Sequence, residues 1–272
     1  MATTIDTGFT ADEARPLDKA RSKARRSRIY LYLALACALV GVGGFMPTYW
    51  MQLPVRTFRG PVLLHIHGAL CTAWLLFLIS QSSLVTRGKV RNHRDWGLLG
   101  IALASVITVV GVTVAIFGLN QRIAQGLGPA DASRSFLIVP LSAIGMFAGF
   151  TAAAIANVKR PEWHRRLMIV GTLGLVEAAA ARIGFVLATG GGPGMRPGMF
   201  PPAPVSRATT VGLLLELLIV AGMIHDWRTM RRIHPAWIVG AAGMTAIILL
   251  RVPFSATPTW IAIADWLGHI AT

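Results

Sequence analysis

The segment WGLLGIALASVITVVGVTVAIFGL, residues 96–119, contains 24 residues without a charged side chain. As a helix, about 20 such residues cross the roughly 30 Å hydrocarbon core of a bilayer. Six further apolar runs of similar length, the last three of which contain one or two charged residues each, occupy residues 29–50, 61–85, 135–158, 167–188, 208–227 and 236–254. A membrane-spanning chain must satisfy its backbone hydrogen bonds internally, so the sequence predicts an all-α, polytopic membrane bundle of about seven transmembrane helices.

The composition agrees with a protein whose solvent is the bilayer. Of its 272 residues, 54% are hydrophobic and 14% are charged, and the mean hydropathy is +0.60. A net charge of +15 would suggest a nucleic-acid partner in a soluble protein, but 18 Lys and Arg residues flank one side of the predicted spans and six the other. This bias predicts a bacterial inner-membrane protein with a cytoplasmic N-terminus and an external C-terminus. Anionic lipids, and not nucleic acid, are the expected partner of the basic side.

Three parts are predicted along the chain. Residues 1–28 are expected to form a disordered basic cytoplasmic tail, 29–254 the seven-helix domain, and 255–272 an amphipathic segment on the outer membrane surface. A histidine follows basic residues and precedes an apolar helix three times, about 70 residues apart, at His93, His164 and His234. This repeat predicts one helix followed by three hairpins.

Three stretches resemble known membrane proteins: HIHGALCTAWLLFLISQSSLVTRGKVRNHRDWG (65–97), PEWHRRLM (161–168) and RIHPAW (232–237). They look like parts of a family of uncharacterised bacterial polytopic membrane proteins, which implies a membrane location and no particular activity. The chain is more loosely similar to cytochrome b561-type and ferric-reductase-type membrane haem proteins. That likeness implies, as an alternative, an electron-transfer protein that binds haem b through His93, His164, His225 and His234.

Ionisable side chains inside the predicted spans are the first candidates for a functional site, because placing them in the bilayer is costly. Six lie there, all between the midplane and the outer surface: His65, His67, Glu177, Arg182, Glu216 and Arg251. In one interpretation, the two glutamates and two arginines form two ion pairs that only fix helix register. In another, they line an outward-opening cavity with the histidines, where arginines bind a small anionic solute or carboxylates relay protons.

Several classes of function lack support in the sequence. The motifs GxSxG, HExxH, GxxxxGK[ST] and GxGxxG do not occur, so no catalytic residue is predicted and the protein is expected to be non-enzymatic. No metal site is expected, because His65 and His67 point about 160° apart on an ideal helix and Cys37 and Cys71 lie in apolar runs. A structural or assembly subunit of the membrane is the third interpretation.

Overall fold

The structure is a computed structural model that describes residues 11–190 and 194–270, with side chains from Arg28 onward except that of Pro197. Every regular element in this part of the chain is helical, which confirms the all-α prediction. The α-helices are α1 (Ala11–Phe45), α2 (Val62–Thr86), α3 (Val90–Ala124), α4 (Ala130–Phe136), α5 (Ile138–Ala156), α6 (Pro161–Thr189), α7 (Val205–Leu215), α8 (Leu217–Met230), α9 (Pro235–Ser255) and α10 (Pro258–Ile270). The short 3-10 helices η1 (Trp50–Gln52) and η2 (Pro197–Met199) lie in connections.

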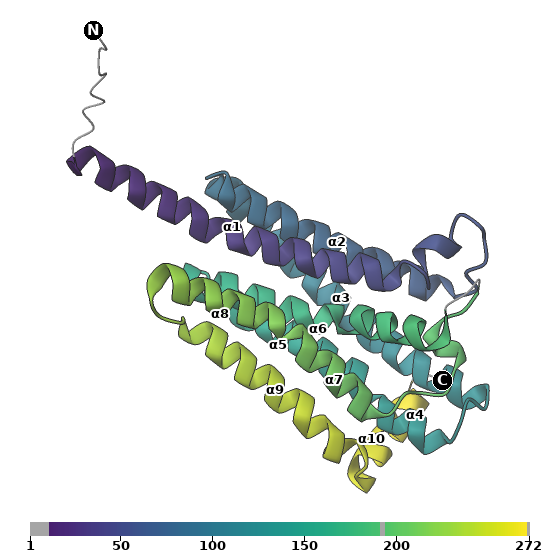
Figure 1. The fold of residues 1–272 in the computed structure, drawn as a ribbon. Coiled ribbons are helices and arrows are strands. Elements are labelled where there is room, and N and C mark those ends of the chain that lie inside the picture. The colour runs from purple at the N-terminus through teal and green to yellow at the C-terminus, as the bar shows by residue number, and fades with distance from the viewer. Residues whose placement is uncertain (1–10, 191–193, 271–272) are drawn as a thin grey trace.

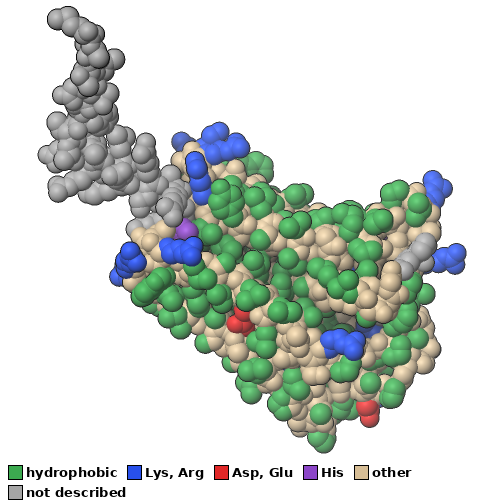
Figure 2. Space-filling model, viewed as in Figure 1, with side chains coloured by type: hydrophobic (Ala, Val, Ile, Leu, Met, Phe, Trp, Pro, Cys, Tyr) green, Lys and Arg blue, Asp and Glu red, His purple; other side chains and the backbone are tan. Residues whose placement is uncertain are grey.

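Seven stretches of the described chain are long and apolar enough to cross a membrane. They are Arg28–Phe45, Val62–Thr86, Val90–Ala124, Ala130–Ala156, Pro161–Thr189, Val205–Met230 and Pro235–Ser255. By length and composition the chain is a polytopic membrane bundle, as predicted. Figure 2 shows hydrophobic side chains over much of the visible face, with Lys and Arg mainly toward its two ends.

Two of these seven spans are interrupted, one between α4 and α5 at Leu137 and one between α7 and α8 at Glu216. Pro140 explains the first interruption, because it has no N–H to donate to the carbonyl of residue 136. The second occurs without a proline. The backbone of Glu216 stays in the helical region (φ −64°, ψ −14°), so this interruption is local.

The spans alternate in direction, so their connections gather at two ends of the bundle (Figure 1). The basic end is defined here by the connections at residues 87–89, 157–160 and 231–234. The distal end is defined by the connections at residues 46–61, 125–129 and 194–204. Ring contacts join the first turns of α3 and α6 and the 231–234 connection at this end: His93 with His164 at 6.1 Å and Trp163 with His234 at 5.6 Å between centroids.

The central helix is α6, which packs against α1, α5, α7 and α9. Glycines allow the closest approaches. A Cβ on Gly44 of α1 would lie 2.0 Å from the carbonyl oxygen of Ala179, and one on Gly174 would lie 2.6 Å from that of Ala143 on α5. A larger residue at either position would push backbones apart. This packing brings the charged side chains of α6 into contact with its neighbours.

The predicted tail and the predicted surface segment both contain helix in their described parts. Residues 1–10 of the expected tail lie outside the described residues, and the backbone from Ala11 onward belongs to α1, so this helix begins before residue 29. Within the expected surface segment 255–272, residues 258–270 form α10, Ser255 ends α9, and residues 271–272 also lie outside the described part. Arg134 on α4 forms an ion pair with Asp265 (2.6 Å), so α10 is packed onto the bundle.

Candidate functional site

Two of the six candidate residues form a buried ion pair in the distal half of the bundle. Arg251 Nη2 on α9 lies 2.6 Å from Glu177 Oε1 on α6, and the two side chains are only 1% and 4% exposed. Arg251 Nη1 also lies 3.4 Å from the hydroxyl of Ser142 on α5. One guanidinium therefore joins three helices. This contact supports the interpretation that the pair fixes helix register.

The second expected ion pair, between Glu216 and Arg182, does not form. Glu216 instead accepts a hydrogen bond from the Thr245 hydroxyl on α9, at 2.9 and 2.8 Å to its two oxygens. Arg182 Nη1 donates to the carbonyl of Ala178 (3.1 Å), and its guanidinium lies 4.0 Å from the ring centroid of Phe45 on α1. The prediction of a second ion pair was wrong, because the Glu216 side chain contacts α9 whereas the Arg182 side chain contacts α1.

The neighbour of Arg182 is a second arginine. The guanidinium of Arg182 lies close enough to Arg122 on α3, and to His67 and Cys71 on α2, to affect them electrostatically. His67 Nε2 lies 3.7 Å from Cys71 Sγ, and the Arg122 guanidinium lies 5.0 Å from the ring centroid of Phe136. We call Arg122, Arg182, His67 and Cys71 the arginine cluster.

The arginine cluster contains two positive charges that no described carboxylate neutralises. Among the described residues, the ion pairs involve other arginines and neither Arg122 nor Arg182. Arg122 Nε is buried without a hydrogen-bond partner there. All four residues of the cluster are half-buried. Like charges repel strongly where water is scarce, so an anion placed between the arginines would be stabilised.

Arg122 was missed by the sequence prediction, which placed it in an external loop beyond residue 119. The helix α3 instead continues to Ala124 and carries Arg122 within its last turns. The available signal was the stretch LNQRIA, residues 119–124, which has no Gly or Pro to end a helix before Gly126.

His65 lies apart from the arginine cluster. Its Nδ1 is 2.9 Å from the Tyr49 hydroxyl, and the Phe58 ring centroid is 5.1 Å from that of His65. His67 faces α3, where a Cβ on Gly111 would lie 3.9 Å from its Cε1. The two histidines therefore do not converge on one ligand, in agreement with their spacing of two residues on a helix.

The most extensive charge network lies at the basic end and centres on Arg166 of α6. This fully buried side chain donates to both carboxylate oxygens of Asp226 on α8, with Nε–Oδ2 at 3.0 Å, Nη2–Oδ1 at 2.9 Å and Nη2–Oδ2 at 2.7 Å. Its Nη1 donates to Glu162 Oε2 at 2.6 Å. The rings of Tyr30 and Trp237 lie 5.7 and 6.0 Å from the guanidinium. The network therefore links α1, α6, α8 and α9.

The four histidines considered as haem ligands fall into two groups. His93 contacts His164, whereas the other two lie beside the Asp226 carboxylate. His225 Nδ1 is 3.8 Å from Asp226 Oδ1, and the backbone N–H of His234 donates to Oδ2 at 3.4 Å. Among the described residues, no group of three or more His, Cys, Asp or Glu is arranged to hold a metal ion.

His234 has a structural role at the start of α9. Its Nδ1 accepts a hydrogen bond from the N–H of Ala236 (3.1 Å), which caps the helix. Burial, and then the Arg166 guanidinium, hold the pKa of His234 below its ordinary value, against the opposing effects of Glu162 and Asp226. A lowered pKa keeps Nδ1 unprotonated, as its role as an acceptor requires.

The arginines described above thus divide into those in buried ion pairs and those of the arginine cluster. The pairs Arg251–Glu177 and Arg166–Asp226 hold helices together, whereas the arginine cluster offers free N–H donors and uncompensated positive charge. Comparison of the chain with the patterns of known protein families, with curated proteins and with solved structures gave no match.

Proposed function

We propose that this protein is a non-enzymatic, multi-pass protein of the bacterial inner membrane that binds a small anionic solute at the arginine cluster. One observation carries the proposal: neither Arg122 nor Arg182 forms an ion pair among the described residues, and Arg122 Nε is buried there without a hydrogen-bond partner. A charge within a bilayer is costly, and a neighbouring charge of the same sign adds repulsion. A bound anion offsets both terms.

The composition of the cluster indicates the class of anion. Guanidinium groups match the geometry of carboxylate and phosphate oxygens, to which they donate paired N–H bonds. The rings of Phe45 and Phe136 lie near the guanidiniums of Arg182 and Arg122, so the N–H edges are the groups left for a ligand. The imidazole of His67 supplies one further polar group. A small oxyanion or carboxylate is therefore the expected ligand.

A proton relay has less support from the geometry. Glu177 is held by Arg251, and Glu216 accepts a hydrogen bond from Thr245. In the described chain, His67 contacts Cys71, and no hydrogen bond or ion pair joins it to either glutamate. The carboxylates and the imidazole thus belong to separate sets of contacts, which favours anion binding.

The proposed orientation places the distal end outside the cell. Its support is the charge bias, with 18 Lys and Arg residues on one side of the predicted spans and six on the other. In this orientation the arginine cluster faces the external medium, and the basic end lies among the anionic head groups of the cytoplasmic leaflet.

Thermal unfolding of the purified chain in detergent tests the anion site. Sulfate, inorganic phosphate and acetate are the probes, compared at constant ionic strength. We expect at least one of these anions to raise Tm. At a concentration 100 times its Kd, a bound anion stabilises the folded state by about 2.7 kcal/mol. Arg182→Gln and Arg122→Gln should each abolish the shift, whereas Arg207→Gln, which alters an exposed arginine toward the same end, should retain it.

Two results would overturn the proposal. One is the absence of a shift with any of the three anions. The other is an equal shift in the parent chain and in both cluster variants. Size-exclusion profiles and helical circular dichroism establish that each variant is folded before the comparison is made.

A further inference from the structure

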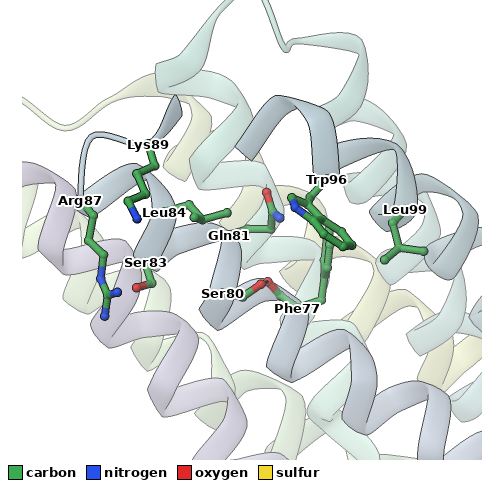
Figure 3. Close-up of a pocket in the computed structure, with 9 residues that line it drawn as sticks. All are labelled: Phe77, Ser80, Gln81, Ser83, Leu84, Arg87, Lys89, Trp96 and Leu99. Carbon is green, nitrogen blue, oxygen red and sulfur yellow. Dashed lines mark hydrogen bonds between the residues drawn. The ribbon is translucent and has the colours of Figure 1, made fainter. Parts of the chain in front are cut away.

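A groove of about 500 Å³ lies at the basic end, between α2 and the first turns of α3. Figure 3 shows that its two ends differ in chemistry, with Gln81 between them. Arg87 and Lys89 occupy one end. Phe77, Trp96 and Leu99 lie toward the other. The groove therefore combines positive charge with an apolar surface.

The positive charge comes from a tight turn between the helices. Gly88 has a φ of +76°, a conformation that favours glycine, and it separates Arg87 from Lys89. Both basic side chains are exposed, and neither forms an ion pair with a described carboxylate. Two cations are thus available at the end of a membrane-spanning hairpin, at the level of lipid phosphates.

The apolar half of the groove faces outward from the bundle. Trp96 is 58% exposed and Leu99 is exposed beside it, while Phe77 is half-buried. Tryptophan near the end of a span is typical of the membrane–water interface, where one part of its ring system meets apolar chains. These three side chains provide a surface on which an acyl chain can lie.

Gln81 supplies a polar group within the groove. The residue is only 7% exposed, and its Oε1 is buried without a hydrogen-bond partner among the described residues. Rotation of the amide by 180° exchanges this acceptor for an N–H donor. Gln81 precedes Arg87 by six residues, which is about 9 Å along the helix, so it lies deeper than the basic turn. A ligand that spans both positions needs a phosphate and a polar group below it.

We propose that this groove binds one anionic glycerophospholipid, with its phosphate at Arg87 and Lys89, an ester carbonyl at the Gln81 amide and an acyl chain along Phe77, Trp96 and Leu99. Each of the three chemical parts of the lipid meets a matching part of the groove. A free phosphate would use only the basic turn and would leave the amide and the aromatic surface unused. This site is separate from the arginine cluster and does not depend on it.

Native mass spectrometry of the full chain, released from detergent with equal amounts of phosphatidylglycerol and phosphatidylcholine of the same acyl chains, tests the proposal. We expect one retained lipid, with phosphatidylglycerol favoured about twenty-five-fold, because each of the two basic side chains contributes about fivefold. Arg87→Gln/Lys89→Gln should reduce this preference to near unity. Gln81→Leu should weaken retention of both lipids, because both carry the ester carbonyls.

The matched control is Arg91→Gln/Arg94→Gln, which removes the same charge from exposed residues of α3 that do not line the groove. It should keep the preference. An equal loss in this control would show that overall charge, and not the groove, selects the lipid, and would overturn the proposal. So would equal retention of the two lipids by the parent chain, displacement by glycerol 3-phosphate, or a second protein chain retained in place of lipid.

Discussion

Breaking the Arg166–Asp226 pair should be the most destabilising single change at the basic end. Asp226→Leu removes three N–H···O contacts of 2.7–3.0 Å and leaves a fully buried guanidinium that retains only Glu162 as a charged acceptor. Removing one partner of a buried pair costs about 3–5 kcal/mol. We expect a loss of that size in reversible unfolding in mixed micelles, followed by tryptophan fluorescence.

The double variant Arg166→Met/Asp226→Leu identifies the cause of this loss. An apolar pair of similar volume leaves no buried charge, so the double variant should be about 2 kcal/mol or more closer to the parent than the sum of the two single losses. Glu162→Gln is the control, and it should cost less than about 1 kcal/mol because its side chain is 46% exposed. Additive losses in the double variant would refute the reasoning.

Three further perturbations test the packing and the titration of the bundle. Glu177→Gln leaves Arg251 buried without its counter-charge and should cost about 3–5 kcal/mol of unfolding free energy, most of which Arg251→Met in the same chain should restore. Gly44→Ala places a Cβ 2.0 Å from a carbonyl oxygen of α6 and should cost about 1–3 kcal/mol, whereas Gly43→Ala, with no atom within 4 Å, should not destabilise. The pKa of His234 is lower in the folded chain, so below pH 6.5 the unfolded chain binds more protons than the folded chain, and Tm should fall as the pH falls. His234→Asn can still cap the helix and should remove the part of this pH dependence that His234 causes.

Each of these predictions has a result that contradicts it. For the ion pair, it is a double variant no more stable than Glu177→Gln alone. For the glycines, it is an equal Tm for the alanine variants at positions 43 and 44. For the histidine, it is an unchanged dependence of Tm on pH after substitution, which would assign the slope to the other histidines of the basic end.

Hydropathy predicted the seven spans because the property that makes a segment cross a bilayer is local to that segment. It placed two arginines wrongly for one shared reason. The predicted spans ended before Arg122 and began after Arg166, yet α3 carries Arg122 and α6 carries Arg166, each beside an aromatic ring. Long arginine side chains can bury their stems and pack on such rings, so a charge does not mark the end of a helix.

The pairing of the charged residues was beyond the reach of sequence patterns. Glu177 contacts Arg251 and not Arg182 because α9 packs beside α6 at that level. Sign balance alone gave two pairs, and it contained no information on which helices are neighbours. Ring contacts do bring His93, His164 and His234 to one end of the bundle, whereas the division into one helix and three hairpins stays a prediction.

The placement of the charges on α6 has a consequence for how the chain is made. During synthesis α6 emerges with Arg166 and Glu177 before the ribosome has reached Asp226 and Arg251, which lie in the last two spans. An unpaired charge near the middle of an inserting helix, where Glu177 lies in α6, costs about 2.5–3.5 kcal/mol. The fifth span therefore becomes stable in the membrane only when the sixth and seventh spans have been inserted. A nascent chain arrested before the seventh span would contain Glu177 without its partner Arg251.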